Sequence, residues 1–277
     1  MRILITGATG TLGRALTTAR ADASDEVIGV SRSNPHGPQL YEWRHLDVRD
    51  EAAVDELIRG VRPDLVVHTA AVMGDWGVTA IGSVNVAAAA ARYGARQVHM
   101  STDAVFAGGS TAYRETDRPS PVTPYGSAKA AAETALGAID PTAAFVRTSL
   151  IVGSDGQSPR ERLVHEALAG SSGRTFFTDE FRCPVSLDDL VGAVWEISDS
   201  GLEGAQHVAG QHSISQYELA VLIARRDGLD EERVRPALRG ARPGAAVIRL
   251  DCTATQAALQ TTFRGARAFL RPPPSPA

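Results

Sequence analysis

The sequence is poor in lysine, cysteine and long apolar runs, and each shortage argues against a class of protein. Lys129 is the single lysine among 28 basic residues, and 32 acidic residues bring the net charge to −4. This charge leaves no basic stripe for a phosphate backbone, so we expect no nucleic-acid partner. The two cysteines, Cys183 and Cys252, lack the CxxC spacing of a thiolate metal site. No stretch reaches the roughly 20 apolar residues of a membrane span, so we expect no membrane insertion.

The remaining composition is that of an ordinary soluble globular protein. The 277 residues are 43% hydrophobic and 22% charged, and this length allows one large α/β domain or two unequal lobes. The chain enters an apolar strand directly after Met1, with no charged segment and cleavage site, so we expect a cytoplasmic protein. The seven histidines lack the HExxH and HxxxH spacings of zinc sites, and we expect no metal.

Short β-branched runs alternate with helix-like segments in the first half of the chain. Strands are expected at residues 2–6, 26–31, 65–69, 97–101 and 144–148, and helices at 11–21, 51–61, 77–92 and 124–136. This alternation predicts βαβ units and a doubly wound parallel sheet, an α/β fold. In the second half the pattern loosens, with helices expected at 160–169, 186–197 and 216–226 and a strand at 206–209.

A glycine-rich loop follows the first expected strand and opens the first expected helix. Its glycines have GxxGxxG spacing. Glycine permits the tight turn and the close approach of a pyrophosphate, and the helix N-terminus offers free N–H groups and a positive dipole. In this position the loop predicts a dinucleotide site in a Rossmann-type fold. The loop residues expected at the cofactor are Gly7, Thr9, Gly10, Thr11, Leu12 and Gly13.

The end of the second expected strand bears on the choice between NAD and NADP. NAD-binding folds usually place an acidic residue about 20 residues after the loop, where it holds the ribose hydroxyls. Here the strand ends in Ser31 and Arg32. An arginine and a serine can instead bind a 2′-phosphate through charge-assisted hydrogen bonds, so we expect NADP(H).

Tyr125 and the single lysine, Lys129, are four residues apart on an expected helix, which places both side chains on one face. A free tyrosine has a pKa of about 10, too high for efficient proton transfer at neutral pH. A nearby ammonium favours the phenolate and lowers that pKa. A compact amine can also hydrogen-bond a ribose, a role that a planar guanidinium fits poorly. The pair therefore predicts a proton-transfer site.

These segments resemble an extended short-chain dehydrogenase/reductase, and within that superfamily the chain is most similar to the dTDP-4-dehydrorhamnose reductase family. The similarity rests on the glycine loop, on Tyr125 to Lys129 and Glu133, and on three further segments, residues 101–106 (STDAVF), 113–125 and 182–190 (RCPVSLDDL). It covers most of residues 1–260. The resemblance implies NADPH-dependent reduction of a keto group on a nucleotide-activated deoxysugar.

The resemblance also implies roles for individual residues. Tyr125 would protonate the developing alkoxide, Lys129 would tune it and hold the ribose, and Thr102 would hydrogen-bond the substrate oxygen. Further residues implied to contact the cofactor are Asp47, Val48, Thr69, Ala70, Ala71, Thr148 and Ser149. The expected substrate contacts are Asp103, Trp76 and Arg182, the last because arginine suits bidentate recognition of phosphate.

The chain departs from the family pattern near the expected site. The segment Val72 to Val78 is shorter than is usual by roughly ten residues, about three helical turns. The family's proton-relay asparagine aligns with Thr79, and Asn85, six residues later, is a possible replacement. Ala104 stands where the family commonly has an aromatic residue. These differences leave the exact substrate open.

The resemblance implies a division into lobes. Residues 1–153 and 184–210 would form an NADP-binding Rossmann domain, residues 154–183 and 211–270 a smaller substrate lobe, and residues 271–277 a disordered tail. A homodimer is possible, since members of the superfamily commonly pair through helices beside the site.

Two other functions remain open. The same cofactor could oxidise and re-reduce one substrate, as in sugar epimerases and dehydratases. A third possibility is a protein that binds NADP without catalysis, like the regulatory subunit of methionine adenosyltransferase, although such a role would not require Thr102, Tyr125 and Lys129.

Overall fold

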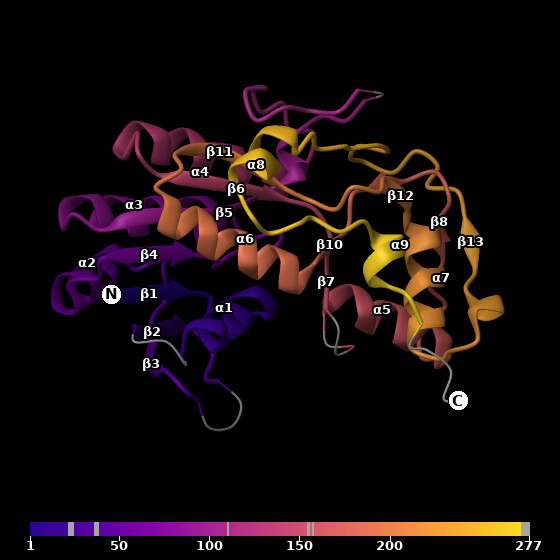
Figure 1. The fold of residues 1–277 in the computed structure, drawn as a ribbon, viewed down its shortest axis with the longest axis horizontal. Helices are drawn as coiled ribbons and strands as arrows, with labels where there is room; N and C mark the ends of the chain where they lie inside the picture. Colours follow the sequence, from indigo (N-terminus) through magenta and orange to yellow (C-terminus); the bar gives the residue numbers. More distant parts are fainter. Residues whose placement is uncertain (22–24, 36–38, 110, 154–155, 157, 273–277) are drawn as a thin grey trace.

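A parallel sheet of seven strands forms the centre of the computed structural model, which describes residues 1–21, 25–35, 39–109, 111–153, 156 and 158–272 (Figure 1). The strand order is β11-β6-β5-β4-β1-β2-β3, and every pairing is parallel. The strands are β1 (Arg2–Thr6), β2 (Glu26–Ser31), β3 (Glu42–His45), β4 (Leu65–His68), β5 (Arg96–Thr102), β6 (Ala144–Thr148) and β11 (Gly204–Val208). The predicted doubly wound α/β fold is therefore confirmed.

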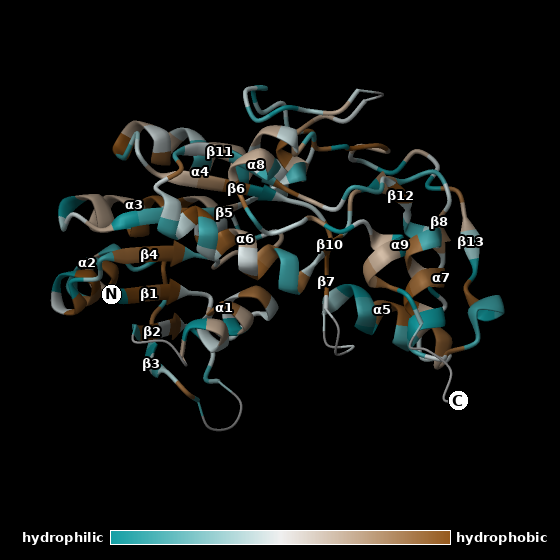
Figure 2. Cartoon of the chain, in the orientation of Figure 1, coloured by the Kyte–Doolittle hydropathy of each residue, from teal (hydrophilic) through white to brown (hydrophobic). Residues whose placement is uncertain are grey.

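Helices cover both faces of this sheet. One face carries α2 (Glu51–Val61), α3 (Gly82–Arg92) and α4 (Pro124–Ile139), and the other carries α1 (Thr11–Ala21) and α6 (Leu187–Ser200). Alternating side chains of each strand enter opposite cores, so Ile3 and Ile5 pack with α1 and α6 while Leu4 packs with α2. Figure 2 shows the resulting hydrophobic strands between helices with mixed faces.

A smaller lobe packs at one end of the sheet (Figure 1). Its core joins α5 (Pro159–Leu168), α7 (Gln216–Arg226) and α9 (Ala266–Phe269). Short strand pairs complete it: β8 (Phe176–Phe177) with β13 (Pro236–Ala237), and β9 (Phe181–Arg182) with β12 (Ile214–Ser215). The pair β7 (Ile151–Val152) and β10 (Val185–Ser186) lies at the junction between the lobe and the sheet.

The chain returns to the main sheet within the segment 211–270 that the sequence assigns to the smaller lobe, and then enters the lobe again at α9. Helix α8 (Thr253–Ala258), expected in the second lobe, lies against β11 of the main sheet. The apolar residues Leu259 and Phe263, which follow α8, are buried in the core beneath α6. Most of the predicted tail, residues 273–277, lies outside the described part of the chain.

The helix predicted at residues 77–92 has a distinct first turn. It begins as a π-helix, η1 (Gly77–Ile81), and continues as α3.

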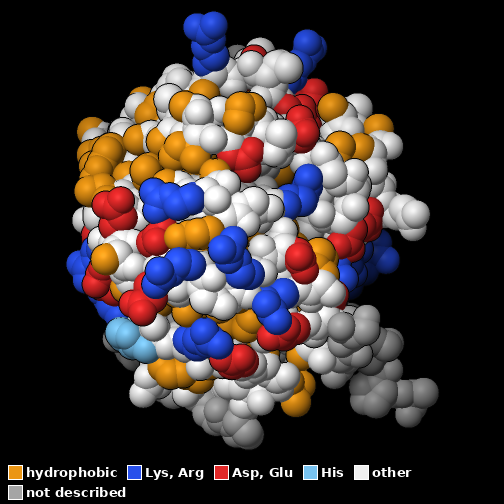
Figure 3. Space-filling model, turned by 90° about the vertical axis from the view of Figure 1, so that its left-hand side faces the viewer, with side chains coloured by type: hydrophobic (Ala, Val, Ile, Leu, Met, Phe, Trp, Pro, Cys, Tyr) orange, Lys and Arg blue, Asp and Glu red, His pale blue; other side chains and the backbone are white. Residues whose placement is uncertain are grey.

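Strand β3 was not predicted, because its residues EWRH carry no alternating apolar pattern. Figure 3 shows the end of the molecule that carries α2 and α3, where basic and acidic side chains are intermixed. No helix in the described ranges is long and apolar enough to cross a bilayer.

Candidate active site

Two connected cavities lie beyond the carboxyl ends of the central strands. The first has a volume of about 390 Å³ and is lined by all seventeen residues predicted to contact the cofactor. The second, of about 770 Å³, extends toward the smaller lobe. Both are lined by Thr11, Ala71, Thr102, Tyr125, Ser149 and Ile151. The position is the one in which α/β sheets bind ligands.

The glycine loop has the shape that a pyrophosphate requires. Gly7 has φ of +68°, and a Cβ atom there would lie 2.8 Å from the Thr69 hydroxyl oxygen. A Cβ atom at Gly13 would lie 2.2 Å from the Gly7 carbonyl oxygen. Only glycine therefore fits this close turn. Helix α1 begins at Thr11 with no acidic residue in its first turn, so its N-terminus favours an anion.

The rim of the first cavity carries no carboxylate at the end of β2. Ser31 accepts a hydrogen bond from the Trp43 indole at 2.8 Å and donates to the Ser33 carbonyl at 2.8 Å. Arg32 is exposed beside it. Asp47, on the next loop, is bound by Arg49, and this bond lowers the pKa of the carboxyl to about 2. Among the described residues that line this cavity, the only carboxylate is thus ionised and already paired with an arginine.

Tyr125 and Lys129 project from the first two turns of α4. The helix begins at Pro124, and the Thr123 hydroxyl accepts a hydrogen bond from the Gly126 amide at 3.1 Å. Lys129 is buried, and its Nζ donates to the Met100 carbonyl at 2.8 Å. Burial lowers the pKa of Lys129 to about 8. The amine therefore lies where β5 and α4 meet.

The pKa of Tyr125 moves in the direction opposite to the one predicted. Burial, and then the negative charge of Asp103, raise the pKa of Tyr125 to about 12. The predicted lowering by Lys129 is absent because the amine is itself desolvated and donates to a carbonyl. The phenol consequently stays protonated at neutral pH.

Thr102 and Asp103 end β5 at the junction of the two cavities. The Thr102 hydroxyl accepts a hydrogen bond from the Ala104 amide at 3.2 Å and donates to Asp103 at 3.3 Å. The Ser149 hydroxyl donates to the other carboxylate oxygen of Asp103 at 2.7 Å. Arg182 Nε lies 3.7 Å from the same oxygen. Burial raises the pKa of Asp103, while Arg182 and Ser149 oppose that rise.

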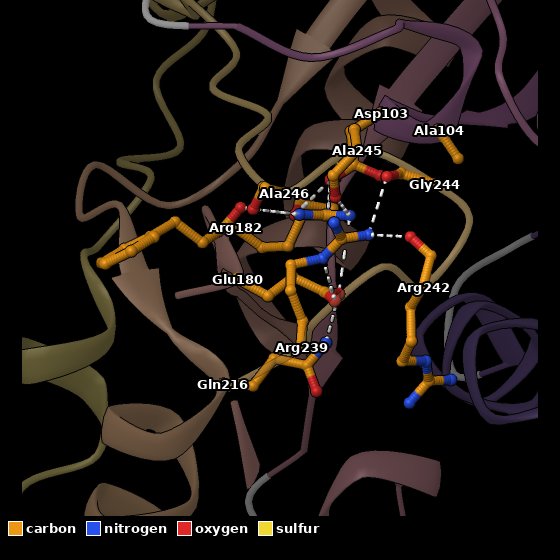
Figure 4. Close-up of polar contacts among 12 residues, drawn as sticks. Asp103, Ala104, Glu180, Arg182, Gln216, Arg239, Arg242, Gly244, Ala245 and Ala246 are labelled. Atoms are coloured by element: carbon orange, nitrogen blue, oxygen red, sulfur yellow. Dashed lines mark hydrogen bonds and ion pairs between the residues drawn. The ribbon is translucent and has the colours of Figure 1, made fainter. Parts of the chain in front are cut away.

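Arg182 connects the smaller lobe to this site, because its guanidinium contacts both Asp103 and backbone carbonyls of the lobe (Figure 4). Its guanidinium donates to the carbonyl oxygens of Phe181, Ala245 and Ala246 at 2.8, 2.9 and 3.3 Å. Glu180 lies 3.6 Å from it, and at the same distance from Arg239. Arg182 therefore lines the second cavity, as predicted for a substrate contact, with most of its donors already engaged.

Sequence reasoning missed most of the second cavity. Arg160 and Arg242 line it, and they also line a third cavity of about 270 Å³ deeper in the lobe. The third cavity is lined by apolar side chains, among them Phe176 and Phe177, and by charged ones, among them Arg174. Arg242 stacks over the Phe177 ring at 5.0 Å. A chain with so many arginines offered no signal for choosing these.

The structure places the three departures from the family pattern in different surroundings. Trp76 is 50% exposed and lines none of the three cavities, whereas Met73 of the same segment lines the second and third. Asn85 donates to the Val48 carbonyl at 3.0 Å and supports that loop, not Lys129. Ala104 lines the second cavity. The described ranges contain no cluster of three or more potential metal ligands.

A parallel dinucleotide-type sheet, a glycine loop and a tyrosine–lysine pair beside a strand-end threonine together define a short-chain dehydrogenase/reductase. The comparisons with known proteins agree. A family model described as the RmlD substrate binding domain matches residues 1–269. The dTDP-4-dehydrorhamnose reductase of Mycobacterium tuberculosis is 32% identical over 252 residues, which cover 85% of this chain and 78% of the relative. The chain therefore belongs to the dTDP-4-dehydrorhamnose reductase family, within the extended short-chain dehydrogenases/reductases.

Two further similarities bear on function. Methionine adenosyltransferase 2 subunit beta of Xenopus laevis is 30% identical over 280 residues, covering 91% of this chain and 80% of that protein. The crystal structure of dTDP-4-dehydrorhamnose reductase from Bacillus anthracis in complex with NADP has a TM-score of 0.76 and 25% identity, covering 97% and 96% of the two chains. The predicted family, fold and oxidoreductase class are confirmed.

Proposed function

We propose that the protein uses NADPH to reduce a keto group on a nucleotide-activated deoxysugar of the dTDP-4-keto-6-deoxysugar type. The observation that carries this proposal is that Thr102 and Tyr125 line both cavities where these meet, while Lys129 lines the first. A carbonyl placed at this junction would face a cofactor on one side and the smaller lobe on the other.

The residues present fit NADP(H). Gly7, Gly10 and Gly13 supply the close backbone approach for a pyrophosphate, and the exposed guanidinium of Arg32, beside Ser31, supplies donors for a 2′-phosphate. The complex of the Bacillus anthracis relative with NADP supports the same assignment. When bound, the reduced nicotinamide supplies a hydride to the carbonyl carbon.

Side chains of this protein supply the proton that the substrate's carbonyl oxygen takes up. The Tyr125 hydroxyl gives its proton to the carbonyl oxygen as that oxygen gains negative charge, and the Thr102 hydroxyl stabilises the same oxygen by hydrogen bonding. Solvent then returns a proton to the Tyr125 phenolate, and the amine of Lys129, which lines the same cavity, would hold the cofactor's ribose. A Tyr125 pKa of about 12 keeps the phenol in the donating form.

The second and third cavities favour a nucleotide sugar as substrate. Arg160 and Arg242, on the wall common to both, can bind a diphosphate, and Phe177 beneath Arg242 offers an aromatic face to a base. We assign substrate contacts also to Asp103 and Arg182, because both line the second cavity. Trp76 remains a predicted contact that would require movement of its segment.

The test is loss of NADPH absorbance with purified protein and a dTDP-4-keto-6-deoxysugar, compared with NADH and with Lys129→Arg. Consumption that prefers NADPH and collapses in Lys129→Arg would support a reductase that needs the amine itself. Saturable NADPH binding without consumption would exclude this substrate.

The similarity to methionine adenosyltransferase 2 subunit beta favours one other candidate, an NADP-binding regulatory subunit. Binding of NADPH and co-purification with a methionine adenosyltransferase, without reductase activity, would identify it. We also propose a homodimer through α3 and α4, whose outer faces carry Val84, Ala88 and Ala131 at least partly exposed, next to the exposed Ile81 at the end of η1. The cytoplasmic location and the two-lobe division remain predictions.

A further inference from the structure

Two buried histidines lie face to face behind the cofactor cavity. His68 ends β4 and His99 lies beside it on β5, with ring centroids 5.1 Å apart and an angle of 12° between the planes. Their polar contacts differ. His99 has no hydrogen-bond partner for either ring nitrogen among the described residues, whereas both nitrogens of His68 are engaged.

One nitrogen of His68 reaches the cofactor loop through Thr6. The Thr6 hydroxyl oxygen accepts hydrogen bonds from the amides of Thr69 and Ala70 at 3.2 and 3.3 Å. Its single proton is therefore free to go to His68 Nδ1, 2.8 Å away. Thr69 and Ala70 line the first cavity and pack directly on Gly7. Thr6 thus fixes the segment that confines the glycine loop.

The other nitrogen of His68 reaches the start of the helix that follows this segment. Since Nδ1 accepts, the proton of the neutral ring is on Nε2, which donates to the Ser83 hydroxyl at 3.1 Å. Ser83 donates to the Thr79 carbonyl at 2.8 Å. The Thr79 hydroxyl in turn donates to the Val72 carbonyl at 2.9 Å and accepts from the Val72 amide at 3.1 Å.

The hydrogen bonds therefore hold both ends of the cavity wall from Thr69 to Val72. Only one tautomer of His68 satisfies all of them, because a protonated Nδ1 would face the proton of Thr6. We propose that His68 is a positioning residue, which sets the wall from Thr69 to Val72 against the glycine loop through Thr6 and against η1 through Ser83. This inference rests on the proposed cofactor site, and it adds to that site a residue that does not line the cavity.

The experiment compares His68→Leu, which removes both hydrogen bonds, with His68→Gln, whose amide can accept from Thr6 and donate to Ser83. His99→Leu is the matched control, since it removes a stacked ring of similar burial that has no hydrogen bond to lose. Amide hydrogen exchange of Thr69, Ala70 and Val72 is measured in the ligand-free proteins. NADPH affinity is measured by fluorescence titration, and the melting temperature of each variant is recorded.

We expect His68→Leu to raise amide exchange in the wall by about tenfold or more and to raise the NADPH Kd by a similar factor, as loss of a buried hydrogen bond implies. His99→Leu should leave both within about twofold even where its melting temperature falls as far. His68→Gln should recover most of the loss. Equal effects of the two leucine variants, or an unchanged wall in His68→Leu, would overturn the inference. Absence of NADPH binding in the wild type would refute the proposed function alone, because the exchange measurement needs no cofactor.

Discussion

Replacing Lys129 with methionine should make the ligand-free protein more stable while it removes the proposed activity. The side chain is only 2% exposed, and its ammonium donates one hydrogen bond within the described structure, to Met100. Burial lowers its pKa from 10.5 to about 8, although the nearby Glu133 opposes this shift. At 1.36 kcal/mol per unit, the folded state carries a cost of about 3 kcal/mol for holding this charge.

The pH range of this cost follows from the two pKa values. The unfolded chain keeps the Lys129 proton up to about pH 10.5, whereas the folded protein releases it near pH 8. The cost is therefore fully present below pH 8 and disappears as the pH rises toward 10.5. The variant also loses the hydrogen bond to the Met100 carbonyl, and this loss lowers its free energy of unfolding by about 1 kcal/mol. The net stabilisation by Lys129→Met at pH 7 is about 2 kcal/mol.

Urea denaturation of the ligand-free wild type and Lys129→Met at pH 7 and pH 10 measures this difference. Other groups titrate equally in both proteins, so they cancel in the comparison. We expect the variant to be more stable at pH 7 and the gap to close at pH 10. A variant less stable than the wild type at pH 7, or a gap of equal size at both pH values, would refute the reasoning.

Three other substitutions test separate parts of the site. Glu133→Gln leaves a buried arginine without its counter-charge and should cost about 3–5 kcal/mol in urea denaturation, whereas Glu231→Gln, which breaks an ion pair on the surface, should change the stability far less. Arg32→Ala should raise the KM for NADPH by about tenfold and leave that for NADH unchanged, since only a 2′-phosphate needs the guanidinium. Asp103→Asn removes the charge that raises the pKa of Tyr125, so the alkaline limb of the kcat/KM profile should move to lower pH. An unmoved limb would contradict that role.

Local sequence spacing predicted the cofactor side of the site well. The glycine loop and the tyrosine–lysine pair are each formed within one strand–helix unit, where a spacing of three or four residues fixes which side chains meet. These residues line one cavity, together with the further contacts that the family resemblance implied on other strands. The start of α2 is likewise formed within one local segment, since Asp50 accepts a hydrogen bond from the Ala53 amide at 3.0 Å.

The substrate side depends on contacts that no local pattern encodes. Glu180, Gln216 and Arg242 meet because isolated two-residue strands fold the smaller lobe back on itself, and such strands have no periodicity to detect. The pKa of Tyr125 also escaped prediction, because helix spacing places Lys129 beside it but does not reveal how deeply both are buried or that Asp103 is near.

The burial of Lys129 gives the folded protein an unusual chemical surface. Because the chain has no other lysine, its side chains present almost no primary amine to solvent. Amine-directed labels should therefore attach at the α-amino group alone, and acetylating or ubiquitin-ligating enzymes find no lysine to modify while the fold is closed. Conversely, a label recovered on Lys129 would report access to the amine, either through the first cavity that it lines or by separation of β5 and α4, which makes this residue an intrinsic probe of the site.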